Sequence, residues 1–242
     1  MKTVTLFNGI KMFLDDKDSL GLKKNKIYEP IETMLIPSLI NKDSICLDIG
    51  AHIGYFTLLM AKYCERVISF EADSVNFSVL KQNIKSNNLE NVLAQCAAVG
   101  EYYGNTPLYL CNDNSGMHRI YPSEVCTNIH VTVPIVPLDS TYHKIDFIKM
   151  DIEGAEYGAL IGMLYLLEHS HPIMIMEFHP PSIEEYGASP KDEYDFLKGL
   201  GYSIRLIPKI SIPISFEELD KETRKEPSGR NILCVREGLN LF

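Results

Sequence analysis

The stretch Ile45-Cys-Leu-Asp48-Ile-Gly50-Ala51-His52-Ile-Gly54 decides the fold of this chain. It begins as an apolar run typical of a buried strand and ends in a turn that contains two glycines. A helix is predicted to follow at once, over Tyr55–Cys64. Glycine lets a backbone approach a ligand without a Cβ in the way, and a helix N-terminus adds free N–H donors. The stretch therefore predicts a site for a nucleotide-like cofactor.

Acidic residues end this strand and the next one. Asp48 closes the first, and Glu71 follows the strand predicted over Arg66–Phe70, where a doubly wound sheet places a carboxylate for a ribose diol. The spacing of Asp48, Gly50 and Gly54 differs from the Gly-x-Gly-x-x-Gly pattern that binds pyrophosphate. A carboxylate there would repel phosphate and attract an amino group. S-adenosylmethionine fits, since it carries an ammonium and a sulfonium but no phosphate. The alternative is that Asp48 only caps the helix and the glycines only make the turn.

Several motifs resemble those of the FkbM family of class I methyltransferases, in family order, and the likeness covers roughly Tyr28 to Ile207. They are Asp48-Ile-Gly-Ala-His-Ile-Gly54-Tyr-Phe-Thr57, Phe70-Glu71, Asn83, Ala97-Ala98-Val99-Gly100 and Asp146-Phe-Ile-Lys-Met-Asp151-Ile-Glu-Gly-Ala-Glu156. The resemblance implies an α/β fold with a doubly wound, Rossmann-like sheet, mostly parallel with an antiparallel edge strand. It also implies S-adenosylmethionine as cofactor. The residues expected to bind it are Asp48, Gly50, Ala51, His52, Gly54, Glu71, Ala72, Ala97 and Ala98.

Two of these positions depart from the family pattern. Ala72 stands where proline usually follows the acidic residue, which loosens the turn but leaves the carboxylate. His52 replaces a common asparagine, and either side chain can donate a hydrogen bond, although His52 could also serve only to stabilise the turn. The small side chains of Ala97 and Ala98 leave room for a flat adenine, or simply ease close packing.

Composition bounds the class of protein. The chain has 242 residues, of which 45% are hydrophobic, enough for one sizeable core. We therefore expect a single domain over residues 1–242, with an N-terminal hairpin and helix in 1–41, a Rossmann-like core in 42–242 and an insertion in 101–138. The formal net charge of −9 disfavours a general nucleic-acid binder.

Nothing in the sequence indicates export or a membrane. There is no charged-then-apolar N-terminal signal, and no apolar run approaches the ~18 residues that span a bilayer. We expect a soluble, cytoplasmic protein. No close Cys-x-x-Cys pair occurs, so we expect all six cysteines to be reduced; they are Cys46, Cys64, Cys96, Cys111, Cys126 and Cys234.

Local patterns predict the elements. Asn8-Gly9 predicts a β-hairpin between Thr3–Phe7 and Ile10–Leu14. Tyr28–Ile40 predicts a helix, kinked or restarted at Pro37, that forms a lid beside the cofactor site. Further strands are predicted over Ser44–Leu47, Arg66–Phe70, Asn91–Val99, Ile145–Met150, Pro172–Met176, Tyr202–Ile207 and Asn231–Val235. Further helices are predicted over Ser74–Asn87, Glu153–Glu168 and Asp192–Leu200, and Ser211–Arg230 is predicted to be an exposed loop.

The insertion contains a polar cluster, Asn112-Asp-Asn-Ser-Gly-Met-His118-Arg119, too rich in donors to suggest a buried element. A stretch like Asn114–Tyr121 occurs in part of the FkbM family. We therefore expect His118 and Arg119 to bind the acceptor and to contribute little to the fold. The alternative is a solvated turn.

Acidic residues also end the last two parallel strands, with Asp151 after one and Glu177 and His179 after the other. In the class I order these strands are neighbours, ~4.8 Å apart, and ligands gather outside their carboxyl ends. Any of the three could act as general base. Together they could hold a divalent metal, but a magnesium site is more usually all oxygen, so direct base catalysis is favoured. The alternative is that the carboxylates only cap helices or pair with Lys149.

These expectations favour methyl transfer to a hydroxyl of a small molecule or sugar, the sugar hydroxyl coming from the resemblance alone. Two alternatives are a nucleotide-dependent oxidoreductase, disfavoured by the missing glycine pattern, and a cofactor-binding partner protein without catalysis.

Overall fold

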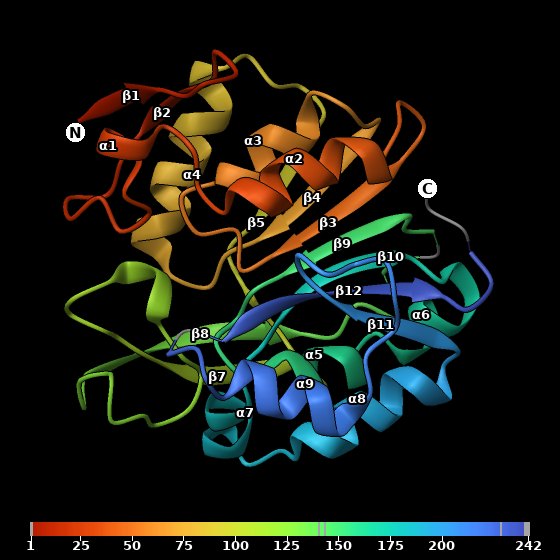
Figure 1. Ribbon diagram of the computed structural model, residues 1–242. Coiled ribbons are helices and arrows are strands. Elements are labelled where there is room, and N and C mark those ends of the chain that lie inside the picture. Colours follow the sequence, from red (N-terminus) through yellow and green to blue (C-terminus); the bar gives the residue numbers. More distant parts are fainter. Residues whose placement is uncertain (1, 140, 143, 228, 240–242) are drawn as a thin grey trace.

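A seven-stranded sheet forms the centre of the computed structural model (Figure 1), which describes residues 2–139, 141–142, 144–227 and 229–239. The strand order is β11-β12-β10-β9-β3-β4-β5. The strands are β3 (Ile45–Ile49), β4 (Arg66–Phe70), β5 (Val92–Gln95), β9 (Phe147–Met150), β10 (Ile173–Phe178), β11 (Tyr202–Leu206) and β12 (Arg230–Arg236). β3, β4, β5, β9 and β10 pair in parallel, whereas β12 runs antiparallel to both β10 and β11. The predicted fold class is confirmed, with the antiparallel strand one place in from the edge.

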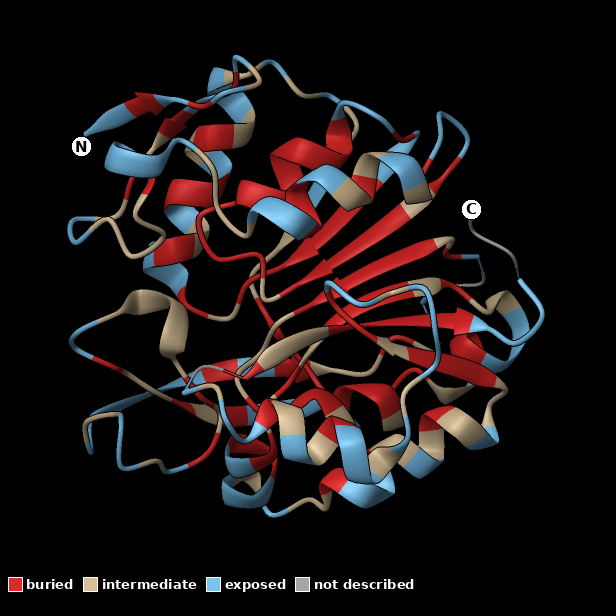
Figure 2. Cartoon of the chain, in the orientation of Figure 1, coloured by how far each residue is buried: buried red, intermediate tan, exposed pale blue. Residues whose placement is uncertain are grey.

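Helices cover both faces of this sheet (Figure 1). The described helices are α1 (Leu22–Asn25), α2 (Pro30–Leu39), α3 (Tyr55–Ala61), α4 (Ser74–Ser86), α5 (Glu156–Ile161), α6 (Leu164–Ser170), α7 (Pro180–Tyr186), α8 (Pro190–Gly199) and α9 (Phe216–Thr223), with a 3₁₀ turn at Ser115–Met117. α2, α3 and α4 lie on one side and α5, α7, α8 and α9 on the other. Successive strand residues feed opposite layers: Cys46 packs with the first and Leu47 with the second. Both strand faces are therefore buried, as Figure 2 shows.

The N-terminal hairpin, β1 (Thr3–Thr5) and β2 (Lys11–Phe13), packs on α4 through one buried amide. Asn83 Oδ1 accepts from the Phe13 N–H at 2.6 Å, and its Nδ2 donates to the carbonyls of Phe13 and Ile53. Asn83 thus joins the hairpin to the glycine turn after β3. The hairpin prediction is confirmed. The predicted restart at Pro37 is wrong, because this proline lies within the last turn of a single helix, where few backbone bonds are lost.

A separate three-stranded sheet forms from the insertion and the two residues of β6 (Ala98–Val99) just before it. It has the order β6-β8-β7, with β6 parallel to β8 (His130–Val136) and β7 (Gly104–Tyr109) antiparallel to it. The single strand predicted over Asn91–Val99 is therefore wrong. The chain leaves the main sheet after β5 because Ala98 and Val99 pair instead with β8, a partner distant in sequence.

Two further predictions in the C-terminal half are wrong. The helix predicted over Glu153–Glu168 is split into α5 and α6 around Gly162, whose Cβ, if present, would lie 1.9 Å from the Gly100 carbonyl oxygen. The predicted loop Ser211–Arg230 contains α9, capped by Ser215 and packed through the buried Leu219. The charged residues on its outer face made the sequence of this short amphipathic helix resemble an exposed loop.

The cysteines are only partly as expected. A disulfide joins Cys111 to Cys126 across the insertion, so the expectation of reduced thiols is wrong for these two. Their spacing gave no signal because the pairing is made by the fold of the loop between them. Cys46, Cys64, Cys96 and Cys234 are free. None of the helices in the described part of the chain is long and apolar enough to cross a membrane.

Candidate active site

The glycine turn after β3 lies against the end of β9. Gly50 has φ +81°, and a Cβ there would sit 1.9 Å from the Asp151 carbonyl oxygen, so no larger residue fits. Gly54 has φ +95°, and a Cβ there would meet Leu80 of α4 at 2.5 Å. Within this frame the buried Asp48 accepts a hydrogen bond from the Thr57 hydroxyl of α3. Burial raises the pKa of Asp48 to about 6.

The carboxylate of Glu71 is fixed by two backbone donors. Its Oε2 accepts from the His52 N–H at 2.7 Å and its Oε1 from the Asp73 N–H at 2.8 Å. Burial raises the pKa of Glu71 to about 7, against the pull of these N–H groups. Each oxygen accepts one bond here and retains capacity for a second. Glu71 is thus oriented in advance to accept from two adjacent hydroxyls.

A cavity with about 580 Å³ of empty volume opens beside Glu71. Its walls include Ala72, Ala97 and Ala98, together with the apolar side chains of Phe70, Val99, Leu108 and Ile120. His118 and Ser115 from the insertion close it. A small-residue wall, an apolar lining and a diol-accepting carboxylate at one end suit a nucleoside.

A second cavity adjoins the first, with about 1080 Å³ of empty volume. Gly50, His52, Gly116, Asp151 and Glu153 line both. The other lining residues are Ser19, Leu20, Tyr28, Glu29, Asp48, Ala51, Tyr55, Phe56, Asn114, Met117, Arg119, Lys149, Glu177, His179 and Pro227. Three distant parts of the chain therefore meet here: the N-terminal segment, the insertion and the carboxyl ends of the sheet.

Acidic groups converge on this second cavity. Oxygens of Asp151, Glu153 and Glu177 lie within 4.8 Å of one another. Burial, together with repulsion from Asp151 and Glu153, raises the pKa of Glu177 well above its ordinary value. Its buried Oε2 has no hydrogen-bond partner among the described residues. The fold thus brings together Asp151 and Glu177, as predicted from neighbouring strand ends, and adds Glu153.

A buried lysine ammonium forms an ion pair with one carboxylate of this cluster. Lys149, on β9, is 1% exposed, and its Nζ lies 3.2 Å from Asp151 Oδ2, 3.2 Å from Asn231 Oδ1 and 3.7 Å from Glu29 Oε2. Burial alone would lower the pKa of Lys149, but the carboxylates of Asp151 and Glu29 outweigh it and raise the pKa overall. Lys149 therefore stays charged.

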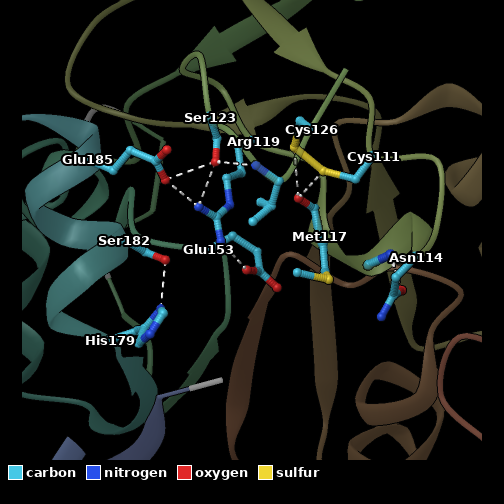
Figure 3. Close-up of polar contacts among 12 residues, drawn as sticks. Cys111, Asn114, Met117, Arg119, Ser123, Cys126, Glu153, His179, Ser182 and Glu185 are labelled. Carbon is cyan, nitrogen blue, oxygen red and sulfur yellow. Dashed lines mark hydrogen bonds and ion pairs between the residues drawn. A yellow bond between two sulfur atoms is a disulfide. The ribbon is translucent and has the colours of Figure 1, made fainter. Parts of the chain in front are cut away.

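His179 lines the same cavity but stands outside the carboxylate cluster. Its Nδ1 lies 2.7 Å from the Ser182 hydroxyl at the start of α7 (Figure 3), which leaves Nε2 for a ligand. Burial, and then the charge of Arg119, lower the pKa of His179. The imidazole is therefore neutral near pH 7.

The two residues of the insertion that were predicted to bind the acceptor line different cavities. His118 lines the cavity beside Glu71, and its Nδ1 accepts from the Cys111 N–H at 3.0 Å. Arg119 lines the second cavity but is only 4% exposed. It binds Glu185 at 2.7 Å and Glu153 at 3.3 Å (Figure 3). The expectation that this segment contributes little to the fold is wrong for Arg119, because carboxylates from the turn after β9 and from α7 satisfy its charge and permit burial.

Sequence reasoning missed several residues of the site. Glu153 lies inside the Asp146–Glu156 motif, so that motif could have pointed to it, whereas Lys149 was considered only as a partner for the carboxylates and does pair with Asp151. Glu153 adopts φ +58°, rare for a non-glycine residue, and burial raises its pKa to about 7. Tyr28 and Glu29 precede α2, and no local pattern distinguished them.

His52 occupies the junction of the two cavities. It adopts φ +50° and is 9% exposed. Its Nε2 lies 2.9 Å from the Ser115 hydroxyl and 3.4 Å from that of Ser19, whereas its Nδ1 has no partner among the described residues. Burial lowers the pKa of His52 to about 4, so the ring is neutral.

Comparison with known proteins assigns this arrangement to a family. The methyltransferase FkbM domain matches residues 48–204, from the carboxylate that ends β3 to the middle of β11. The chain belongs to the FkbM methyltransferase family. No curated protein sequence matches it.

Three solved structures with similar folds are distant from this chain in sequence. The methyltransferase FkbM from Methylobacillus flagellatus KT has a TM-score of 0.51 at 19% identity; the match covers 80% of this chain but 43% of that one. TYW2 from M. jannaschii, solved in complex with AdoMet, has a TM-score of 0.52 at 16% identity and covers 96% and 83%. The precorrin-6y C5,15-methyltransferase from Geobacter metallireducens GS-15 has a TM-score of 0.52 at 10% identity and covers 93% of each chain. At such identities these likenesses establish the fold alone.

Proposed function

We propose that this FkbM-family protein transfers the methyl group of S-adenosylmethionine to a hydroxyl oxygen of a small molecule or sugar. One observation carries the proposal. The cavity beside Glu71 shares Gly50, His52 and Asp151 with a second cavity that is also lined by Glu177. A donor and an acceptor can therefore meet where the two cavities adjoin.

The residues present fit S-adenosylmethionine. Glu71 is oriented to accept from the ribose hydroxyls, and the small side chains of Ala72, Ala97 and Ala98 border the space for adenine. Asp48 lines the second cavity, where a cationic amino group would hold this buried carboxylate in its ionised form. Gly50, Ala51 and Gly54 shape the turn beneath, and His52 offers the free Nδ1.

The cofactor supplies an electrophilic methyl group on a sulfonium. The chain's task is to orient the acceptor and to take its hydroxyl proton. Lys149 holds Asp151 through Oδ2, so Oδ1 is available in the cavity to accept that proton. Glu177 and the free Nε2 of His179 line the same cavity and are the other candidate bases.

A divalent metal at Asp151, Glu153 and Glu177 is less favoured. Lys149 already lies 3.2 Å from Asp151, and Arg119 lies 3.3 Å from Glu153. These two cations neutralise much of the charge that a divalent ion would need, and they would repel it. We therefore expect methyl transfer to survive a chelator.

Labelled S-adenosylmethionine and a panel of hydroxylated small molecules test the proposal. Methyl transfer should occur with at least one acceptor and collapse in Asp151→Asn and His179→Ala, while S-adenosylhomocysteine binds both variants normally. Glu237→Gln, at an exposed surface pair with Lys198, is the control. Cofactor binding without transfer to any acceptor would favour a non-catalytic partner protein. Preferential binding of NAD would favour an oxidoreductase.

A further inference from the structure

The second cavity has an excess of negative charge. Its described lining includes five carboxylates, from Glu29, Asp48, Asp151, Glu153 and Glu177. It includes two permanent cations, Lys149 and Arg119. Its histidines add no charge near neutral pH, since burial lowers the pKa of both His52 and His179. S-adenosylmethionine would bring one net positive charge, so the carboxyl groups would still outnumber the positive charges.

Among the clustered carboxylates, Glu177 is the one that no cationic side chain of the described residues pairs with. Lys149 is shared between Asp151 at 3.2 Å and Glu29 at 3.7 Å. Arg119 is shared between Glu153 at 3.3 Å and Glu185, which lies outside the cavity, at 2.7 Å. In the described part of the chain no cationic side chain forms an ion pair with Glu177, although its Oε2 is buried. A buried carboxylate without a partner is costly, so it calls for a cation or a proton.

Two other side chains show independently that the cavity is built to hold a polar ligand. His52 and Arg119 are 9% and 4% exposed, and both line the cavity. Nδ1 of His52 and Nε of Arg119 are buried and without hydrogen-bond partners among the described residues. Polar atoms buried this deeply normally form hydrogen bonds, so we expect a bound molecule to supply the missing partners.

We propose that the methyl acceptor is a hydroxylated amine, such as an amino sugar, whose ammonium group binds Glu177 together with Asp151 and Glu153. This rests on the proposed methyl transfer and names its substrate class. The three carboxylate oxygens lie within 4.8 Å of one another. An ammonium that donates to all three at about 2.8 Å would set the oxygens about 4.6 Å apart, a spacing within that limit.

The rest of the wall suits a cation and a sugar. Tyr28, Tyr55 and Phe56 pack together at centroid distances of 5.2 to 6.1 Å and line the cavity, and aromatic faces attract ammonium groups. A monovalent ammonium also matches Glu177, which has no ion-pair partner among the described residues, better than a divalent metal does. Acidic acceptors such as uronates would be repelled by the same carboxylates.

Calorimetry on the protein saturated with S-adenosylhomocysteine tests this without knowledge of the natural acceptor. The matched probes are 6-amino-6-deoxy-D-glucose, D-glucose and D-glucuronate at neutral pH. The amine should bind at least about tenfold tighter than glucose, as expected for charge-assisted hydrogen bonds, and glucuronate should bind least. Burial and the neighbouring carboxylates raise the pKa of Glu177, so a bound ammonium should lower that pKa again and release protons. Glu177→Gln should abolish both the preference and the proton release, whereas Glu237→Gln should keep them.

Each contrary result has a separate meaning. Equal or tighter binding of glucose, a preference that survives Glu177→Gln, or failure of the amine to bind would overturn the amine inference and leave the methyltransferase proposal in place. Binding of the probes only with added Mg²⁺ would also overturn it, in favour of a metal. Failure of S-adenosylhomocysteine itself to bind would overturn the proposed function and the inference together.

Discussion

Replacing Glu71 with alanine should weaken cofactor binding by an amount that the structure sets. The carboxylate oxygens accept from the N–H groups of His52 and Asp73, which fixes them for the ribose hydroxyls. Loss of a hydrogen bond to a charged group costs ~1.5–3 kcal/mol, or about ten- to a hundredfold in affinity. The two N–H groups would also lose their acceptor, at ~1–3 kcal/mol each unless water enters. We therefore expect weaker binding together with a lower melting temperature.

A matched ligand separates these two effects. Calorimetry would compare S-adenosylhomocysteine with its 2′-deoxy analogue in wild type and in Glu71→Ala. If Glu71 accepts from the ribose diol, wild type should prefer the complete ribose and the variant should lose most of that preference. Because burial holds the pKa of free Glu71 at about 7, and the hydroxyls bind the ionised form, wild-type affinity should also fall as the pH drops below 7. An unchanged preference for the complete ribose in the variant would refute the ribose assignment.

Three other perturbations address the core and the chemistry. Arg119→Met should destabilise the fold by ~1.5–3 kcal/mol in denaturant titrations, because the partly exposed Glu153 and Glu185 lose charged hydrogen bonds. A change within the surface range of ~0.5 kcal/mol would show that the ion pairs are not needed. Glu193 is fully buried, and neither carboxylate oxygen has a hydrogen-bond partner among the described residues. Burial raises its pKa well above the ordinary value. The contribution of Glu193 to the free energy of unfolding should thus be greatest below the unfolded pKa of ~4.3 and decline as the pH rises towards the folded pKa. Glu193→Gln should lack this part of the pH dependence. Parallel pH–stability curves for the two proteins would contradict this. Once an acceptor is known, Asp151→Asn should lower turnover at least about a hundredfold with chelator present or absent. Loss of wild-type turnover in chelator would show that a bound metal activates the acceptor hydroxyl.

The parts of the fold that were predictable are those specified by neighbouring residues. The turn with Gly50 and Gly54 could be recognised because a strand, two glycines and a helix follow one another without interruption. The bounds of β4 were predicted correctly because a compact apolar run ends at a carboxylate. The convergence of Asp151 and Glu177 followed from the order of the strands. Each inference needed only local pattern and general topology.

The parts that escaped prediction are fixed by distant contacts. Ala98 and Val99 look like a continuation of β5, and only β8 draws them into another sheet. Gly162 looks like an ordinary helix residue until the backbone of Gly100 is seen against it. From the sequence, Arg119 is expected to be exposed to solvent, because its two carboxylate partners lie 34 and 66 residues away. A polar residue can be judged exposed or buried only when its partners are known.

Arg119 also explains how an insertion outside the main sheet becomes part of the site. Glu153 follows β9 in a left-handed backbone conformation and lines both cavities, so its charge would be costly without a counterion. The sheet itself supplies Lys149, which is already engaged by Asp151 and Glu29. The insertion supplies the second cation, and the Glu185 contact anchors that cation to α7. The same segment presents Ser115 to His52 and His118 to the cavity beside Glu71. A change in this segment should therefore alter cofactor binding, acceptor binding and stability together, because one buried guanidinium links the insertion to the carboxylates at the sheet's edge.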